Sequence, residues 1–379
     1  MGATVLIAAF SGRALAQSAR RAGYEPLVAD AFGDLDMREA AADFRVIDSA
    51  VQAGFKTKPL VAALDDLIQS AERPPIGLVL GSGFEDKPRL VAALGSRYRL
   101  LGSDAATLHA CKDPSKFFAT LDRLHIAHPE TQTAPPADTR DWISKRVGGS
   151  GGRHIRICRG RQNARLRRYF QKLLEGERLS IGGLFAIRAT GGGGCLVAVT
   201  RQWMSPTAEQ PFRFGGAVSR PDVDRDLYAR LASSASSAAT ILNLVGMASF
   251  DFIVSGGSHY LLEVNPRPGA SLDVLDEEDG YLFSAHVAAW NGDYFSSCAR
   301  PARPARAAAI LHADRGPIVL GDAPWPEWSA DRGAPGSFVP KGGPLATAFA
   351  DAPTADVAEA LARARLAELE DLIYGHAKS

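Results

Sequence analysis

The chain has 379 residues, a length that predicts two or three domains rather than one. Apolar residues make up 46% and charged residues 22%, the balance of a globular protein with enough apolar material for a core. The net charge of +1 gives the surface no strong overall field, and no apolar run reaches the ~20 residues of a membrane span. These properties argue against nucleic acid and membranes as partners.

The four cysteines are far apart in the sequence, at Cys111, Cys158, Cys195 and Cys298. No two of them have the spacing of metal ligands, so we interpret all four as buried or idle thiols. Unpaired thiols suit a reducing compartment, and we therefore expect a cytoplasmic protein.

Strands and helices alternate over the first 103 residues. The run from Thr4 to Phe10 is continuously apolar, as in a strand covered on both faces, and Ser11-Gly12-Arg13 follows as a turn. Further strands are predicted at residues 25–29, 44–48, 77–80 and 98–101, and helices at 14–22, 58–72 and 87–94. This α/β order predicts a doubly wound parallel sheet in an N-terminal domain over residues 1–103.

The pattern changes in a central α+β domain, which we assign to residues 104–299. Helices are predicted to begin at Ser103-Asp104 and at Asp113-Pro114. Strands from Trp142 to about Leu262 predict a mainly antiparallel sheet, interrupted by a long helix at residues 223–242. Glycine-rich turns separate these strands at residues 148–152, 182–183, 191–194 and 256–257.

A small C-terminal unit is predicted over residues 300–379. It begins with a Pro/Arg/Ala linker at residues 300–306. Strands are predicted at residues 307–311 and 318–320, and a final helix at 354–374.

Two apolar strands joined by Ser255-Gly256-Gly257-Ser258 predict a hairpin with a metal site. In a hairpin turning near residue 257, Asp251 and Glu263 stand opposite each other on one face, and Asn265 lies on the same face. Facing carboxylates repel unless a cation lies between them, and hard oxygen ligands suit Mg²⁺. The alternative is a hairpin with scattered surface acids.

The exit from this hairpin is Asn265-Pro266-Arg267-Pro268. Two prolines make that exit rigid, which favours fixed positions for Asn265 and Arg267. The planar fork of Arg267 is suited to contact a phosphate.

A glycine-rich loop, Gly148-Gly149-Ser150-Gly151-Gly152, follows a strand that ends near Lys145. Such a loop can fold over phosphates and offer its backbone N–H groups, while Lys145 neutralises phosphate charge. Neither a Walker loop nor a dinucleotide fingerprint is present. A glycine-rich hairpin turn without a ligand is an equally good interpretation of this loop by itself.

The segment from Arg168 to Ser180 is predicted to be a strand end, a connector and another strand. Backbone groups of the connector, Gln171-Lys172-Leu173-Leu174, can pair with an adenine edge, and Glu177 can accept from ribose hydroxyls. By itself the segment fits a solvated turn equally well.

In this order, these segments resemble the ATP-grasp superfamily over residues 1 to about 350. The resemblance implies that Lys116 and Lys145 are the two nucleotide lysines and that residues 148–152 form the flexible lid. It assigns residues 171–174 to adenine, Glu177 to ribose, and Asp251, Glu263 and Asn265 to the metal. Arg267 would lie beside the phosphates.

Two positions depart from the family pattern. Gln171 stands where a glutamate is common, which puts the adenine contact in doubt. Ser249 stands where several amide-forming relatives have an oxyanion arginine, so that role would fall to Arg201 or Arg267.

The resemblance implies an ATP-dependent ligase that uses ATP with Mg²⁺, or Mn²⁺, to phosphorylate a carboxylate. An amine then attacks the acyl phosphate, and Lys145 and Arg267 are the expected catalytic residues. The stretch from Trp142 to Ile155 is most similar to ligases of methanofuran- and tetrahydromethanopterin-linked one-carbon metabolism, such as tyramine–glutamate ligase. Two alternatives stay open: a bicarbonate-activating carboxylating enzyme of the purine type, and a non-catalytic nucleotide-binding protein.

Small-molecule substrates are expected between the N-terminal domain and the central sheet, and a homodimer is compatible with this plan. By the crevice rule, Ser11, Gly12 and Arg13 at the carboxyl end of the first strand are candidates to bind substrate. The other candidates are Arg201, Trp203 and Arg213. Residues 153–168 contain seven arginines, which form either a solvated basic face or a site for an acidic substrate such as glutamate.

Overall fold

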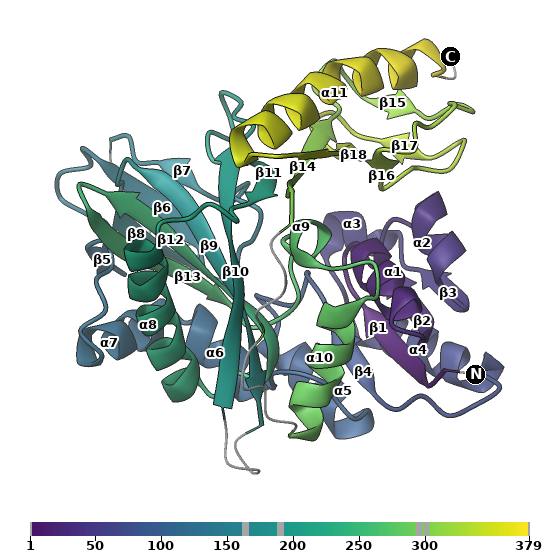
Figure 1. Cartoon of the computed structure of the whole chain (residues 1–379), viewed down its shortest axis with the longest axis horizontal. Coiled ribbons are helices and arrows are strands. Elements are labelled where there is room, and N and C mark those ends of the chain that lie inside the picture. The colour runs from purple at the N-terminus through teal and green to yellow at the C-terminus, as the bar shows by residue number, and fades with distance from the viewer. Residues whose placement is uncertain (1, 161–166, 188–192, 293–297, 299–302, 378–379) are drawn as a thin grey trace.

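The computed structural model describes residues 2–160, 167–187, 193–292, 298 and 303–377. An N-terminal unit packs beside a large central sheet, and the C-terminal helix lies along one edge of the molecule (Figure 1). In the described part of the chain, no helix is both long enough and apolar enough to cross a membrane.

The N-terminal unit is the predicted doubly wound sheet. Its strands are parallel and lie in the order β3-β2-β1-β4, with every residue of β1 buried between two layers of helices. The strands are β1 (Thr4–Ala8), β2 (Glu25–Asp30), β3 (Asp43–Val46) and β4 (Leu78–Leu80). The helices are α1 (Arg13–Arg21), α2 (Leu35–Ala40), α3 (Ser49–Ala53), α4 (Thr57–Ser70) and α5 (Pro88–Arg97).

The strand predicted at residues 98–101 is reduced to a single bridge. Leu100 pairs with Leu78, and the chain then leaves the sheet at Gly102 to begin the next helix. The segment is too short for a ladder because the helix start at Asp104 follows directly.

The strands of the central unit pair antiparallel, as predicted, but they form two sheets, and the turn predicted at residues 182–183 is wrong because both glycines lie inside a strand. The smaller has the order β5-β8-β6-β7, made of β5 (Thr131–Gln132), β6 (Trp142–Arg146), β7 (Arg156–Ile157) and β8 (Arg168–Lys172). The larger begins β13-β12-β9-β10-β11, made of β9 (Glu177–Ala186), β10 (Gly193–Met204), β11 (Phe214–Ser219), β12 (Gly246–Ser255) and β13 (Ser258–Asn265). The helices of this unit are α6 (Ala105–Lys112), α7 (Pro114–Arg123), α8 (Arg225–Leu242), α9 (Leu272–Leu275) and α10 (Tyr281–Asn291).

The C-terminal strands extend the large sheet. β14 (Ala305–His312) pairs with β11, and β18 (Pro344–Ala352) pairs with β14. A boundary at residue 300 therefore separates segments that share one sheet. The remaining elements are β15 (Ile318–Val319), β16 (Ser329–Ala330), β17 (Phe338–Val339) and α11 (Ala355–Gly375). Part of the predicted turn at 191–194 and the first three residues of the predicted linker at 300–306 lie outside the described residues, and Ala305 and Arg306 of that linker belong to β14.

The central core lies between α8 and the large sheet. Small residues on one side of α8, including Ala235, Ala238 and Ala239, let the helix approach Phe250 and Phe252 of β12 closely. This packing holds β12, and with it the hairpin, in a fixed position.

The interpretation of all four cysteines as free thiols is wrong for one pair. Cys195 of β10 and Cys298 are disulfide-bonded, with their Cα atoms 5.6 Å apart, whereas Cys111 and Cys158 are free and buried. The two bonded cysteines are 103 residues apart in sequence, so their spacing gave no indication of the pair.

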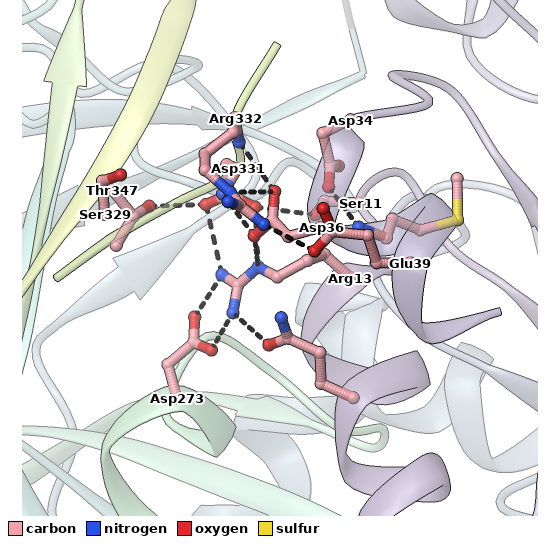
Figure 2. A network of polar contacts seen from close by, with 12 residues as sticks. Ser11, Arg13, Asp34, Asp36, Glu39, Asp273, Ser329, Asp331, Arg332 and Thr347 are labelled. Carbon is pink, nitrogen blue, oxygen red and sulfur yellow. Dashed lines mark hydrogen bonds and ion pairs between the residues drawn. The ribbon is translucent and has the colours of Figure 1, made fainter. Parts of the chain in front are cut away.

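Arg13 joins the three parts of the chain (Figure 2). Its side chain is only 3% exposed, and its guanidinium donates to both carboxylate oxygens of Asp273 at 2.5 and 2.8 Å and to Asp331 at 3.0 Å. Asp36 of α2 accepts from the backbone N–H groups of Asp331 and Arg332 at 2.9 and 2.8 Å. We call Arg13, Asp36, Asp273 and Asp331 the interdomain network.

We predict that Arg13→Met lowers the free energy of unfolding by about 3–5 kcal/mol, because it leaves the buried carboxylates of the interdomain network without their cation. Chemical denaturation would measure the loss. Arg20→Met, an exposed arginine on the same helix, is the matched control. Equal losses in the two variants would contradict the assignment.

Candidate functional site

The β12–β13 hairpin places its acids as predicted. Asp251 pairs with Glu263, and Ser249 pairs with Asn265. The turn is made by Gly256 and Gly257, whose φ angles of 55° and 78° favour glycine.

A bulge sets the register of this hairpin. Ser255 pairs with Ser258 across the two-residue turn, and this register continues to Phe252 opposite Leu261. The register then shifts between Phe252 and Asp251. Without that shift Asp251 would stand opposite Leu262, so the bulge brings the two acids together.

The oxygen atoms of the hairpin form one connected cluster. The Asn265 side chain donates to Asp251 at 3.1 Å, and the buried ammonium of Lys112 donates to the Asn265 oxygen at 2.7 Å. Lys112 also forms an ion pair with Glu263. From β10, Gln202 donates to the other oxygen of Asp251 at 3.4 Å. We call Asp251, Glu263 and Asn265 the acidic cluster.

The charges of the acidic cluster depend on cations nearby. Burial and the charge of Glu263 raise the pKa of Asp251. Burial alone would raise the pKa of Glu263 too, but the ammonium groups of Lys112 and Lys145 hold it below its usual value. A site with two carboxylates and an amide oxygen fits a hard cation such as Mg²⁺ that takes its remaining ligands from phosphate and water.

Lys145 is buried in β6, next to the acidic cluster. Its ammonium donates to the Gln171 side chain at 2.7 Å and lies 6.0 Å from the ring centre of Tyr169. Burial lowers the pKa of Lys145 to about 8, against the opposing influence of Glu263 and Asp251. Its charge is therefore available near neutral pH and sensitive to the surroundings.

The connector at residues 171–174 is already partly hydrogen-bonded within the chain. The Gln171 side chain, 1% exposed, is held between Lys145 and Thr131. The backbone N–H groups of Lys172 and Leu173 donate to the backbone carbonyls of Glu130 and Asp141, at 2.9 and 2.7 Å. An adenine edge would have to use other groups of the connector. Glu177 accepts from Arg220 at 2.6 Å.

The glycine loop at residues 148–152 lies between the N-terminal unit, at Glu85, and strand β11 of the large sheet, at Phe214. Gly148, Gly151 and Gly152 have φ angles of 70°, 65° and 72°. The carbonyl of Gly151 accepts from Phe214 at 3.1 Å. A Cβ at Gly148 would lie 2.6 Å from the carbonyl oxygen of Glu85, so glycine is needed for this approach.

Lys112, not Lys116, reaches the acidic cluster. Lys116 is exposed on α7, whereas Lys112 is the last residue of α6 and is buried. The helix break at Asp113-Pro114 separates the two lysines and sends them in different directions. Sequence reasoning missed Lys112. The one available signal was its place directly before that break.

Arg201 and Trp203 lie on the other face of β10 from Gln202, since side chains alternate along a strand. Arg201 forms ion pairs with Asp356 and Glu359 of α11 at 2.7 and 2.9 Å. Trp203 is 9% exposed and packs under the guanidinium of Arg363. Their expected substrate role, and an oxyanion role for Arg201, do not fit this placement.

The remaining substrate candidates also have partners within the chain. Arg213 is 1% exposed and donates to Asp314 through both terminal nitrogens, at 2.8 and 2.7 Å. Ser11 contacts Asp331, the Gly12 N–H contacts Asp30, and Arg13 belongs to the interdomain network. These residues connect units of the fold, so their proposed contact with substrate has no support from their geometry.

The arginine-rich segment is largely a solvated face. Arg153, Arg156, Arg159 and Arg167 are exposed, while Arg168 donates to backbone carbonyls at 2.7 Å. Arg161 and Arg165 lie outside the described residues.

Arg267 follows the hairpin and faces the N-terminal unit. Its Nε and Nη2 atoms donate to one carboxylate oxygen of Glu85, at 2.9 and 2.6 Å. Arg201 and Arg267 were the two candidates for the oxyanion role. Arg201 lies on the opposite face of the sheet, so of these two only Arg267 lies beside the acidic cluster.

Comparison with known proteins bears on the fold. Residues 111–271 match the model of the ATP-grasp domain family. An L-amino acid ligase from Bacillus licheniformis is similar with a TM-score of 0.69 and 15% identity, covering 98% of each chain. An ADP complex of N5-carboxyaminoimidazole synthetase from Staphylococcus aureus has a TM-score of 0.67 and 14% identity, covering 97% of each chain. A biotin carboxylase from Campylobacter jejuni has a TM-score of 0.64 and 13% identity, covering 98% of this chain and 91% of that one.

The chain therefore has the ATP-grasp fold, with its ATP-grasp domain at residues 111–271. At these identities the solved structures establish the fold, and the reaction has to be argued from the site.

We predict that the affinity for Mg·ADP falls roughly tenfold between pH 7 and pH 9.5, because Lys145, with a pKa of about 8, loses its charge over that range. In Lys145→Arg the affinity should stay nearly constant, since arginine remains charged. Titration calorimetry at several pH values would measure both. Lys116→Arg is the control and should keep the wild-type profile. An unchanged pH dependence in Lys145→Arg would contradict the role of Lys145.

Proposed function

We propose that this protein is an ATP-dependent ligase that activates a carboxylate as an acyl phosphate and joins it to an amine. The observation that carries the proposal is the meeting of the acidic cluster with Lys112 and with Lys145, whose strand leads into the glycine loop, inside a domain that matches the ATP-grasp family. This arrangement suits transfer of a phosphoryl group, where catalysis is mainly positioning and neutralisation of charge.

The acidic cluster would hold Mg²⁺ or Mn²⁺, which supplies neutralisation of phosphate charge when bound. Lys145 and Arg267 would spread the negative charge that remains on the transferred group. Closure of the glycine loop would exclude water, which otherwise hydrolyses an acyl phosphate.

The substrate class is supported by one relative and one sequence resemblance. The protein from Bacillus licheniformis is an L-amino acid ligase, and its similarity covers nearly the whole of both chains. The stretch from Trp142 to Ile155 resembles ligases of methanofuran-type one-carbon metabolism. Amino acids, with glutamate first, are therefore the proposed carboxylates, and amino acids or arylalkyl amines such as tyramine are the proposed acceptors.

Bicarbonate activation is the second candidate. The synthetase from Staphylococcus aureus and the biotin carboxylase from Campylobacter jejuni both match the chain through its C-terminal unit. Bicarbonate-dependent formation of ADP, without any requirement for another carboxylate, would favour this reaction.

We predict that ADP release in the presence of Mg²⁺ rises at least tenfold when the right carboxylate and amine are both present. A coupled assay over a panel of amino acids, amines and bicarbonate would measure it. If no carboxylate with an amine raises ADP release, the ligase proposal fails. Tight ATP binding without turnover on the whole panel would instead favour a non-catalytic nucleotide-binding protein.

We predict that Glu263→Gln and Asn265→Ala each lower kcat at least about 100-fold while the fold survives, since each removes one oxygen ligand from the acidic cluster. Steady-state kinetics together with thermal unfolding would show both effects. Glu278→Gln, an exposed acid on the loop before α10, is the control. Normal activity in both variants would refute the metal assignment.

A further inference from the structure

Arg267 is held from outside its own domain, by Glu85 in the turn between β4 and α5. Two nitrogens of the guanidinium, Nε and Nη2, donate to the same oxygen of Glu85 at 2.9 and 2.6 Å. The third nitrogen, Nη1, donates to the carbonyl of Pro268 at 3.2 Å. The contacts fix the plane of the guanidinium and still leave N–H bonds on Nη1 and Nη2.

Glu85 is a buried charge with a fixed orientation. Its side chain is 3% exposed, and its second oxygen accepts from the N–H of Gly83 at 2.8 Å. Burial would raise the pKa of Glu85, but Arg267 and Lys112 hold it below its usual value. The preceding residue, Phe84, stacks on Phe55 at 5.1 Å, which fixes the turn to the N-terminal core.

The same turn supports the glycine loop. A Cβ at Gly148 would lie 2.6 Å from both the carbonyl oxygen of Glu85 and the Cα of Asp86, so the loop rests directly on this backbone. The cavity behind the Glu85–Arg267 pair has a volume of about 30 Å³, which is room for about one water molecule. The hydrogen bonds to Glu85 and Pro268 are what hold the Arg267 guanidinium in place.

We propose that Glu85 is a positioning residue for the ligase reaction: it orients Arg267 toward the group being phosphorylated and transmits closure of the glycine loop to that arginine. This inference rests on the proposed function, because it assigns Arg267 to the phosphate. Glu85 contacts Arg267 through its side chain and Gly148 through its backbone, so a single turn connects the glycine loop with Arg267.

The test is Glu85→Gln, which keeps the shape and an acceptor oxygen but removes the charge. We expect kcat for coupled ADP release to fall about 10- to 100-fold, while the KM for ATP changes less than about twofold. Glu85→Asp, which keeps the charge but is one methylene shorter, should recover part of the rate. Glu72→Gln, the same substitution at an exposed glutamate of the N-terminal unit away from this turn, is the matched control and should behave as the wild type.

A double-mutant cycle with Arg267→Lys separates positioning from a structural effect. If Glu85 acts through Arg267, adding Glu85→Gln to Arg267→Lys should cause little further loss of kcat. Losses that multiply, or a KM for ATP that rises as much as kcat falls, would overturn the inference.

A binding measurement tests Glu85 even if no substrate pair supports turnover. Calorimetry of inorganic phosphate with the protein saturated with Mg·ADP should show about tenfold weaker binding in Glu85→Gln and unchanged ADP binding. Tighter phosphate binding would overturn the inference, because it would make Glu85 a competitor for Arg267. Wild-type protein without carboxylate- and amine-dependent ADP release would refute the proposed function and leave this binding result standing. Should Glu85→Gln lose its fold in thermal unfolding, Glu85→Asp carries the same binding comparison, with weaker phosphate binding expected.

Discussion

The central constraint in this protein is the repulsion between Asp251 and Glu263. A tight hairpin with a bulge forces the two carboxylates onto one face, where burial and mutual charge make ionisation costly. Nearby cations and hydrogen bonds offset this repulsion: Lys112 contacts Glu263 and Asn265, and the ammonium of Lys145 lies close enough to lower the pKa of Glu263. A site that concentrates cations and oxygen ligands in this way is suited to bind phosphates with a divalent cation.

Other arginines, buried or half-buried, have a different use elsewhere in the chain. Arg13, Arg201 and Arg213 each meet carboxylates from a distant segment, and together they tie the N-terminal, central and C-terminal parts into one body. A planar guanidinium with several donors can satisfy two carboxylates at once, which makes it effective where units meet. Arg267 is bound in the same manner by Glu85, yet it lies beside the acidic cluster and keeps N–H bonds available.

The fold leaves the second substrate open. The same architecture covers an amino acid ligase and two carboxylating enzymes over nearly their full lengths. The proposed phosphate site lies on a strand and a hairpin that the fold fixes, whereas the choice of acceptor in one fold generally depends on loops. The structure therefore supports the proposed activation of a carboxyl group more directly than it supports any particular acceptor.

Features that depend on local pattern could be predicted from the amino-acid order. Alternating apolar runs predicted the doubly wound unit, and a Gly-Gly turn between two apolar strands predicted the hairpin that carries Asp251 and Glu263. The bulge that sets these two acids opposite each other had no signal in the sequence pattern. Tertiary structure alone decided which residues meet across long distances. In the folded chain Lys112, and not Lys116, contacts the acidic cluster, and Arg201 pairs with α11 on the other face of the sheet. Cys195 is bonded to Cys298, and Glu85 accepts hydrogen bonds from Arg267. Spacing along the chain carries no information on such contacts, because they arise only when separate units pack against one another.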